Sequence, residues 1–250
     1  MNPRRPAGRP RLLNEFNRKG LDEDVADRLR DLILKGELLP GAHLIEMDLA
    51  SAHDVSQGTV RAALKILQHE GLVEHRPRRG KFVNETSADD AFEIYTLRDS
   101  LEALGARCAA ERITDSGRAE LNRALQALRV GVLSGNRRRV MDLDFKFHRT
   151  IVELSGHRRL IDLYNLIEAQ VRLFMTLTMS DRFHHDLTEV LSIHEPIAKA
   201  IARGDAGRAA ELASRHNERD GRHLIAAMGA NSGTEVSEVV GSPRKAKLAR

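Results

Sequence analysis

An aspartate and a histidine lie four residues apart on one predicted helix, in an arrangement that could hold a metal ion. In the stretch 140–154, apolar residues recur at helical spacing and form one stripe, made of Val140, Leu143, Phe147, Ile151 and Leu154. Asp144 and His148 lie at the edge of that stripe, so both side chains point partly into the protein. A half-buried carboxylate needs a cation or hydrogen-bond donors beside it. The pair therefore predicts a polar or metal-binding site on the inner face of this helix.

Two more histidines lie on apolar helix faces further along the chain. His194 falls within the apolar stripe of the predicted helix 190–201, and His216 falls in the middle of the stripe of 209–227. Three imidazoles and one carboxylate form a ligand set that suits a divalent transition metal. We expect zinc, with nickel or manganese as alternatives, held by Asp144, His148, His194 and His216.

The same histidines have a plainer interpretation, in which each buried imidazole separately donates a hydrogen bond to a backbone carbonyl. The coincidence of three histidines with Asp144 favours the metal over that alternative. His223 lies two turns beyond His216 on nearly the same face and is a rival for the last ligand position. Pro196 interrupts the regular helical pattern near His194 and leaves the start of that helix open.

A second group of residues has the chemistry of DNA recognition. Ser56 is a suitable N-cap for a helix whose apolar face consists of Val60, Leu64 and Leu67. The opposite face is polar, and glutamine and arginine are donors suited to base edges in the major groove. We expect this helix to enter the groove by its N-terminal end. Its predicted DNA contacts are Gln57, Gly58, Thr59, Arg61 and Lys65.

A basic turn follows this helix. Leu72-Val73 and Phe82-Val83 bracket the sequence Arg-Pro-Arg-Arg-Gly-Lys at 76–81, a pattern typical of a two-stranded hairpin. Such a loop can neutralise phosphates or insert an arginine into the minor groove, and a glycine allows close approach. The predicted contacts here are Arg78, Arg79 and Gly80. A solvated charged face on a small helical unit is the alternative.

The order of the elements predicts a small DNA-binding unit at the N-terminal side of the chain. Helical spacing over 22–35 and a short helix at 46–52 precede the helix from Ser56 and the hairpin. Three helices followed by a hairpin are typical of a winged helix-turn-helix, which we place at residues 21–84.

The rest of the chain predicts a helical bundle. The polar stretch Asn84 to Ala88 is the expected boundary, and residues 89–229 have the pattern of about six helices of 15 to 25 residues. Breaks fall near Thr114-Asp115, 131–136, Ser155-Gly156, Ser180-Asp181 and Gly204-Asp205. The predicted fold is therefore mainly α: a winged helix-turn-helix with a small β-hairpin wing, followed by an all-α antiparallel bundle.

The composition narrows the class of protein but does not show whether its partner is a nucleic acid. The net charge of +4 divides into +2 for residues 1–87, zero for 88–230 and +2 for the remainder, so charge alone does not indicate nucleic acid. The single cysteine fits a reducing cytoplasm, and we expect no membrane partner because no apolar run approaches the roughly 20 residues needed to span one. Residues 1–20 are expected to be a flexible basic arm and residues 230–250 a disordered tail.

The stretch from Val25 to Val83 resembles the winged-helix domain of GntR-type transcriptional regulators. The resemblance rests on Leu29-Arg30, Ile33-Leu34, Gly36, Pro40-Gly41, Leu49-Ala50, Val55-Ser56, Val60-Arg61, Ala63-Leu64, Leu67, residues 70–73 and Arg79-Gly80. It implies that Arg61 contacts bases and that Arg79-Gly80 forms the wing tip. The family commonly shows Arg-Thr-Pro at the head of the recognition helix, whereas this chain has Gln57-Gly58-Thr59. That departure leaves the preferred operator bases open.

Residues 89–229 resemble the FCD ligand-binding domain of the FadR branch of the same family. Its metal-binding members show Asp-x-x-x-His on one helix and two later histidines, which match Asp144, His148, His194 and His216 here. In such members the effector is often a small organic acid whose carboxylate reaches the metal. Arg98 and Arg172 are our candidates for holding that acid, because a guanidinium offers a fork matched to carboxylates. A helix-surface ion pair, such as Arg98 with Glu102, is the alternative for these arginines.

These observations together predict a cytoplasmic, ligand-responsive transcriptional regulator that is not an enzyme. We expect a repressor that binds a palindromic operator as a homodimer, because half-sites mirror two-fold symmetry. A regulator for which the metal itself is the signal is one alternative. A metal-dependent hydrolase is another, and it would need an acid or base beside the metal, for which Glu153 and Glu195 are the nearest candidates in sequence.

Overall fold

The structure of the chain is a computed structural model, which describes residues 20–177 and 187–232. The predicted arm at 1–20 therefore lies outside the described residues except for Gly20, and the predicted break at Ser180-Asp181 also lies outside them. The predicted tail lies outside them from residue 233 onward. Residues 230–232 belong to the last helix, so the helix extends slightly beyond its predicted end.

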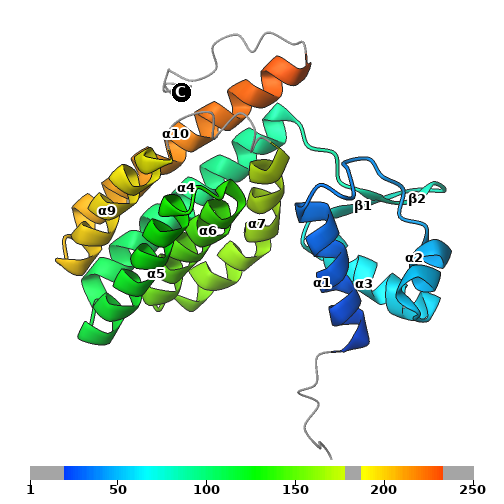
Figure 1. The fold of residues 1–250 in the computed structure, drawn as a ribbon, viewed down its shortest axis with the longest axis horizontal. Coiled ribbons are helices and arrows are strands. Elements are labelled where there is room, and N and C mark those ends of the chain that lie inside the picture. The colour runs from blue at the N-terminus through cyan, green and yellow to red at the C-terminus, as the bar shows by residue number, and fades with distance from the viewer. Residues whose placement is uncertain (1–19, 178–186, 233–250) are drawn as a thin grey trace, which may run out of the picture.

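Three helices and a hairpin form the N-terminal unit (Figure 1). The helices are α1 (Leu21–Leu34), α2 (Glu46–His53) and α3 (Gln57–His69), and the strands are β1 (Val73–Arg76) and β2 (Gly80–Val83). The apolar residues predicted to face inward on α1 and α3 do so, since Leu29, Leu64 and Leu67 are fully buried. Burying each such side chain contributes about 1.5–3 kcal/mol of transfer free energy.

The hairpin pairs antiparallel, with Val73 opposite Val83 and Arg76 opposite Gly80. The predicted winged helix-turn-helix with a β-hairpin wing is thus present. Its ladder is extended by a bridge between His43 and Phe82, whose rings also stack with centroids 4.5 Å apart. The wing is therefore anchored to the segment between α1 and α2.

Residues 84–87 contain no helix or strand, and the bundle begins after them. Ser87 and Asp90 form a reciprocal capping box that starts the first bundle helix, satisfying two backbone N–H groups. The described bundle helices are α4 (Ala88–Arg112), α5 (Asp115–Leu133), α6 (Arg137–Leu154), α7 (Arg158–Leu177), α9 (Thr188–Ala202) and α10 (Ala206–Ser232). The predominantly helical fold class predicted from the sequence is confirmed. Helix α9 runs unbroken through Pro196.

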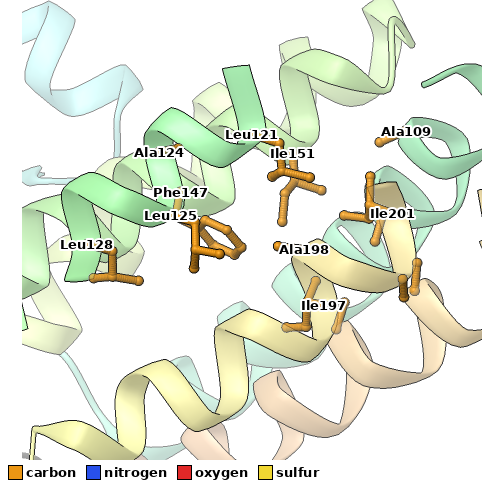
Figure 2. Close-up of a cluster of buried hydrophobic side chains, with 14 of the residues drawn as sticks. Ala109, Leu121, Ala124, Leu125, Leu128, Phe147, Ile151, Ile197, Ala198 and Ile201 are labelled. Atoms are coloured by element: carbon orange, nitrogen blue, oxygen red, sulfur yellow. The ribbon is translucent and has the colours of Figure 1, made fainter. Parts of the chain in front are cut away.

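The largest apolar core of the bundle joins α5, α6 and α9 with parts of α4 and α10 (Figure 2). Phe147 on α6 is fully buried there, and its ring meets the rings of His148 and His194 edge-on at centroid distances of 5.6 and 5.1 Å. The candidate metal ligands therefore lie against a packed apolar core, which holds their helices in fixed positions.

Helix α7 packs against both parts of the molecule. Ala169 and Leu173 are buried within the apolar core of the N-terminal unit, and Thr176 donates a hydrogen bond to the Leu34 carbonyl at 3.0 Å. In Figure 1, α7 is the bundle helix next to α1. Along the described ranges, 20–177 and 187–232, no helix is long and apolar enough to cross a membrane.

Candidate metal centre and DNA-binding surface

The structure brings the four predicted metal ligands together from three helices. Asp144 and His148 come from α6, His194 from α9 and His216 from α10. One ligand atom from each residue lies within 4.8 Å of the others, and each residue is at most 5% exposed. Residues separated by up to 72 positions in the sequence thus form one buried polar cluster.

The spacing of the nitrogens is that of a ligand set. His148 Nε2 lies 3.1 Å from both His194 Nε2 and His216 Nε2, and His194 Nε2 lies 2.6 Å from Asp144 Oδ1. Imidazole and carboxylate ligands bind zinc at about 2.0–2.2 Å, which places neighbouring ligand atoms about 3 Å apart. The four donors therefore fit a single divalent ion of this kind.

Contacts on the far side of the imidazoles orient two of them. The Nδ1–H of His148 donates to Glu102 Oε2 at 2.8 Å, and that of His194 donates to the Val190 carbonyl at 2.6 Å. Each contact places the hydrogen on Nδ1, so the lone pair of Nε2 can bind a metal ion, as is usual for metal-bound histidines. The backbone hydrogen bond expected in the plainer interpretation thus exists at His194, where it orients the ring toward the cluster.

The sequence analysis named Glu102 only as a surface partner of Arg98 and missed its contact with His148. Glu102 is 2% exposed, and its Oε1 accepts from Arg98 Nε at 2.8 Å and from the Tyr164 hydroxyl at 2.9 Å. Its Oε2 accepts from His148 and from Asn217 Nδ2, the latter at 3.0 Å. The interpretation of Arg98 and Glu102 as a surface ion pair is wrong, because both side chains are buried at the centre of the bundle.

Contacts within this cluster keep its buried carboxyl groups ionised. Although burial favours the neutral acid, Arg98 and His148 hold the pKa of Glu102 well below its usual range. Burial likewise opposes ionisation of Asp144, yet His194 and the other histidines keep the pKa of this carboxyl well below its usual value. Burial lowers the pKa of His216 to about 3, so this imidazole is neutral at pH 7 and offers a lone pair.

A count of the buried charged groups points the same way. The carboxylates of Glu102, Asp144 and Asp220 are each at most 6% exposed, and Arg98 is the buried cation beside them. Asp220 Oδ2 lies 3.7 Å from His216 Nε2. The three buried carboxylates outnumber the one buried guanidinium, and a bound cation would offset that excess of negative charge. Buried charges persist only when they are compensated in this way.

The predicted DNA contacts lie at one exposed end of the N-terminal unit. Ser56 caps α3 by accepting a hydrogen bond from the Thr59 N–H at 3.1 Å. Among the predicted helix contacts, Gln57, Gly58, Arg61 and Lys65 are exposed and Thr59 is partly buried. Glu46 at the start of α2 pairs with Arg61 at 2.8 Å, a contact that the sequence analysis did not foresee. Glu46 thus holds the guanidinium at the surface.

The wing presents the remaining predicted contacts. Arg78 and Arg79 are exposed at the turn between β1 and β2, where Arg78 adopts φ +62° and Gly80 φ +102°. The left-handed conformation at Gly80 is one that glycine adopts without strain. The other two basic residues of the turn are engaged, since Arg76 pairs with Glu74 and Lys81 with Gln68.

Comparison with known proteins assigns the N-terminal unit and the helical bundle to two different domain families. The sequence family described as bacterial regulatory proteins of the gntR family matches residues 21–83, and the FCD domain family matches residues 93–219. The second match covers half of the chain. The chain belongs to the GntR family of transcription regulators and carries an FCD domain.

Relatives of this GntR regulator include named repressors. The gluconate operon transcriptional repressor of Bacillus licheniformis is 30% identical over 72% of this chain and 75% of its own length. A protein of Paenarthrobacter nicotinovorans, named "Probable D-xylose utilization operon transcriptional repressor", is 28% identical over 77% of this chain and 85% of its own. A solved GntR transcriptional regulator from Rhodococcus sp. RHA1 superposes with a TM-score of 0.70 at 29% identity, covering 82% of this chain and 98% of its own.

Within the FCD domain of this regulator, the two predicted effector arginines occupy different environments. Arg98 is fully buried, and neither Nη1 nor Nη2 has a hydrogen-bond partner among the described residues. Arg172 is partly exposed, pairs with Asp142 at 2.8 Å and lies over the ring of Phe145. The Arg98 guanidinium lies over the rings of Tyr95 and Phe145, at 5.5 and 6.0 Å from their centroids, whereas Arg172 has a carboxylate partner.

The rival residues from the sequence analysis lie away from the cluster. His223 is exposed on α10, so it does not join the other imidazoles. Glu153 is exposed and pairs with Arg149, and Glu195 pairs with Arg129 across α5 and α9. Neither glutamate is therefore placed beside the candidate metal ligands.

Proposed function

We propose that this GntR regulator is a ligand-responsive repressor whose FCD domain holds a divalent metal ion and a small organic acid. The observation that carries the proposal is the convergence of Asp144, His148, His194 and His216 in a buried cluster. The buried carboxylates of this cluster outnumber its one buried guanidinium, which supports a bound cation.

The metal would be held by those four side chains, with zinc expected and nickel or manganese as the alternatives. The bound ion would supply a Lewis-acid position for the carboxylate of an organic acid. The residues of the chain then orient that carboxylate. The unpartnered Nη groups of Arg98 support this role, since Arg98 is tied through Glu102 to the ligand His148.

The charge of Arg98 is available for such an acid. Burial works against a charged guanidinium, but Glu102 and the nearby tyrosines keep the pKa of Arg98 well above its usual value. Buried guanidinium N–H groups without partners are costly, and a bound carboxylate would satisfy two of them with charge-assisted hydrogen bonds. Arg172 remains a weaker candidate for the effector site, because Asp142 already occupies it.

DNA binding would use the exposed end of α3 and the wing. Gln57, Gly58, Thr59, Arg61 and Lys65 would enter the major groove, while Arg78, Arg79 and Gly80 would lie against the backbone or in the minor groove. A domain of residues 21–84 would thus read operator DNA, and a domain of residues 89–229 would sense the effector.

The mode of regulation follows from the relatives and from the geometry of DNA. Relatives named as repressors of gluconate and D-xylose operons support repression by this chain, acting in the cytoplasm. One winged helix makes limited contact, so we infer a homodimer on a palindromic operator. Effector binding would shift the population between two arrangements of the DNA-binding heads, which requires different effector affinities in the two states.

The test compares DNA binding with and without metal and acid. Operator fragments are first selected from the organism's own genome, and affinity for them is measured by fluorescence anisotropy. Lactate, malate, citrate and gluconate serve as probes on zinc-loaded and EDTA-treated protein. We expect at least one acid to lower operator affinity about 10-fold or more when zinc is present and to have no effect after EDTA, an ordinary size for allosteric coupling.

A matched pair of variants tests whether the response to metal and acid depends on the buried cluster or on any histidine of the domain. His148→Ala should bind operator and lose both the metal and the acid response, whereas His223→Ala should behave as wild type because His223 is exposed. If chelation alone switches operator affinity and acids add nothing, the metal itself is the signal. Turnover of simple esters or phosphates would favour the hydrolase, which the family membership argues against.

A further inference from the structure

A cavity lies between α4 and α10, and Asn217 on its wall donates a hydrogen bond to Glu102, which contacts the candidate ligand His148. Its volume is about 230 Å³, smaller than the pockets of about 300–1,000 Å³ that hold drug-sized ligands. The two helices run alongside each other where it forms (Figure 1). The walls used in the argument below are Phe92, Tyr95 and Asp99 from α4, with Asn217, Glu218 and Ile225 from α10.

Part of the cavity wall is apolar and aromatic. Phe92 is 46% exposed, and it lines the cavity together with Tyr95 and Ile225. An exposed ring at the mouth of a hollow is available to cover the apolar body of a ligand. Aromatic faces also attract organic cations through the ring quadrupole.

The deeper polar atoms of the cavity are acceptors. Asn217 is 1% exposed and donates its Nδ2–H to Glu102 Oε2, so its amide orientation is fixed and its Oδ1 is left without a partner. Asp99 Oδ1 is also buried without a partner, while the Asp99 carboxylate accepts from Ser214 through its other oxygen. Both atoms accept hydrogen bonds and neither can donate, so a complementary ligand must bring N–H or O–H groups.

The electrostatics of the cavity select the charge of that ligand. Burial, together with the negative charges of Glu218 and Glu102, raises the pKa of Asp99. The one cation on the cavity wall, Arg222, lies 3.7 Å from Glu218 and is half-exposed. A second anion would add to this repulsion, whereas an ammonium group would relieve it and satisfy both unpartnered oxygens.

We propose that the cavity between α4 and α10 binds a small molecule with a primary ammonium group on an apolar or aromatic body. Asp99 would hold the ammonium ion as its counter-charge, Asn217 Oδ1 would accept one of its N–H groups, and Phe92 would cover the apolar part. This ligand differs in charge from the organic acid proposed for the metal centre, so the chain would carry two sites of opposite preference.

Isothermal titration calorimetry on the full-length protein as purified tests the proposal. The probe is 2-phenylethylammonium, with 3-phenylpropionate and 2-phenylethanol as its anionic and neutral counterparts. We expect the ammonium compound to bind at least 10-fold more tightly than either counterpart. Equal affinity for the three compounds, or no saturable binding of the ammonium compound up to millimolar concentration, overturns the proposal.

Two substitutions locate the site. Asp99→Asn keeps the shape of the side chain and should weaken binding of 2-phenylethylammonium at least 10-fold, and Phe92→Ala should weaken it several-fold without disturbing the core. Glu111→Gln is the matched control, because Glu111 is an exposed carboxylate on the same helix, outside the cavity. Wild-type affinity in Asp99→Asn would overturn the assignment.

A spectroscopic readout keeps the result independent of folding defects. In a spectrum of ¹³C-labelled isoleucine methyl groups, 2-phenylethylammonium should shift the signal of Ile225, which lines the cavity. The signal of Ile197, buried in the main core of the bundle, should stay in place. A shift of Ile197 with none at Ile225 would place the ligand elsewhere and contradict the proposal.

Discussion

At the scale of single residues, the candidate metal centre depends on groups that never touch the ion. Glu102 accepts hydrogen bonds from His148, Arg98, Tyr164 and Asn217, and so joins α4, α6, α7 and α10 at one carboxylate. Such outer contacts set both the direction and the basicity of a ligand imidazole. The position of the His148 ring is thus controlled from α4.

Glu102→Gln should therefore weaken metal binding without removing a ligand. The expected loss is about 10- to 100-fold in zinc affinity, the usual effect of changing an outer partner of a metal-bound histidine. The same change leaves the Arg98 charge without its buried partner, so the protein should also lose stability, by up to about 3–5 kcal/mol. Competition with a chromophoric chelator measures the affinity, with Glu111→Gln as the control. Wild-type zinc affinity in folded Glu102→Gln would show that Glu102 has no part in the centre.

At the scale of elements, α7 is a helix that contacts both the surroundings of the candidate metal centre and the core of the N-terminal unit. Its Tyr164 hydroxyl donates to Glu102, beside the candidate metal centre. Nine residues further along α7, Leu173 is 1% exposed inside the core of the N-terminal unit. Gln170 lies so close to Gly71 that a Cβ added to this glycine would be 2.6 Å from the Gln170 side chain. A movement of α7 would thus reach both Glu102, beside the candidate metal centre, and the turn between α3 and the wing.

Leu173→Ala tests that connection through stability. Removing a fully buried leucine leaves a cavity and should lower the free energy of unfolding by about 2–5 kcal/mol. Leu133→Ala on α5 is the control, because Leu133 is 80% exposed and its truncation should change stability by less than about 0.5 kcal/mol. Urea denaturation measures both. A loss at Leu173 no greater than at Leu133 would mean that α7 does not complete the core of the N-terminal unit.

The recognition helix and the wing should respond differently to loss of an arginine. Arg61→Ala should reduce affinity for the selected operator by about 1–3 kcal/mol and relax sequence preference, as expected for a base contact. Arg79→Ala should weaken binding to all duplexes alike and reduce the salt dependence of log K by about one unit. Arg208→Ala, on α10, is the control. The interpretation of the wing fails if Arg79→Ala changes sequence preference and leaves the salt dependence unchanged.

Periodicity predicted most elements because apolar stripes such as that of α3 report burial directly. It also placed His148, His194 and His216 on inner faces. Periodicity could not decide whether His216 or His223 is the last ligand, because residues seven apart on a helix share a face. The choice depends on which turn of α10 lies opposite His148 and His194. Arg98 and Glu102 have the spacing of a surface ion pair, and their burial is a consequence of how α4 packs against α10.

At the scale of the whole molecule, the proposed DNA-binding surface and the candidate metal centre lie in separate parts of the chain. The DNA-contacting residues proposed here belong to α3 and the wing, while the buried histidines belong to α6, α9 and α10. Figure 1 shows that these two sets of elements lie in different parts of the molecule. The apolar core of the bundle in Figure 2 adjoins those imidazoles and fixes their helices. Regulation would then require that an ion and an acid bound within the bundle change how two DNA-binding heads are held.

Anomalous diffraction from crystals of the protein purified without chelator tests the central claim most directly. Data collected above and below the zinc, nickel and manganese absorption edges would identify any bound ion. We expect one anomalous peak per chain, at bonding distance from Asp144, His148, His194 and His216. Absence of a peak, with the three imidazoles hydrogen-bonded only to protein groups or water, would contradict the account.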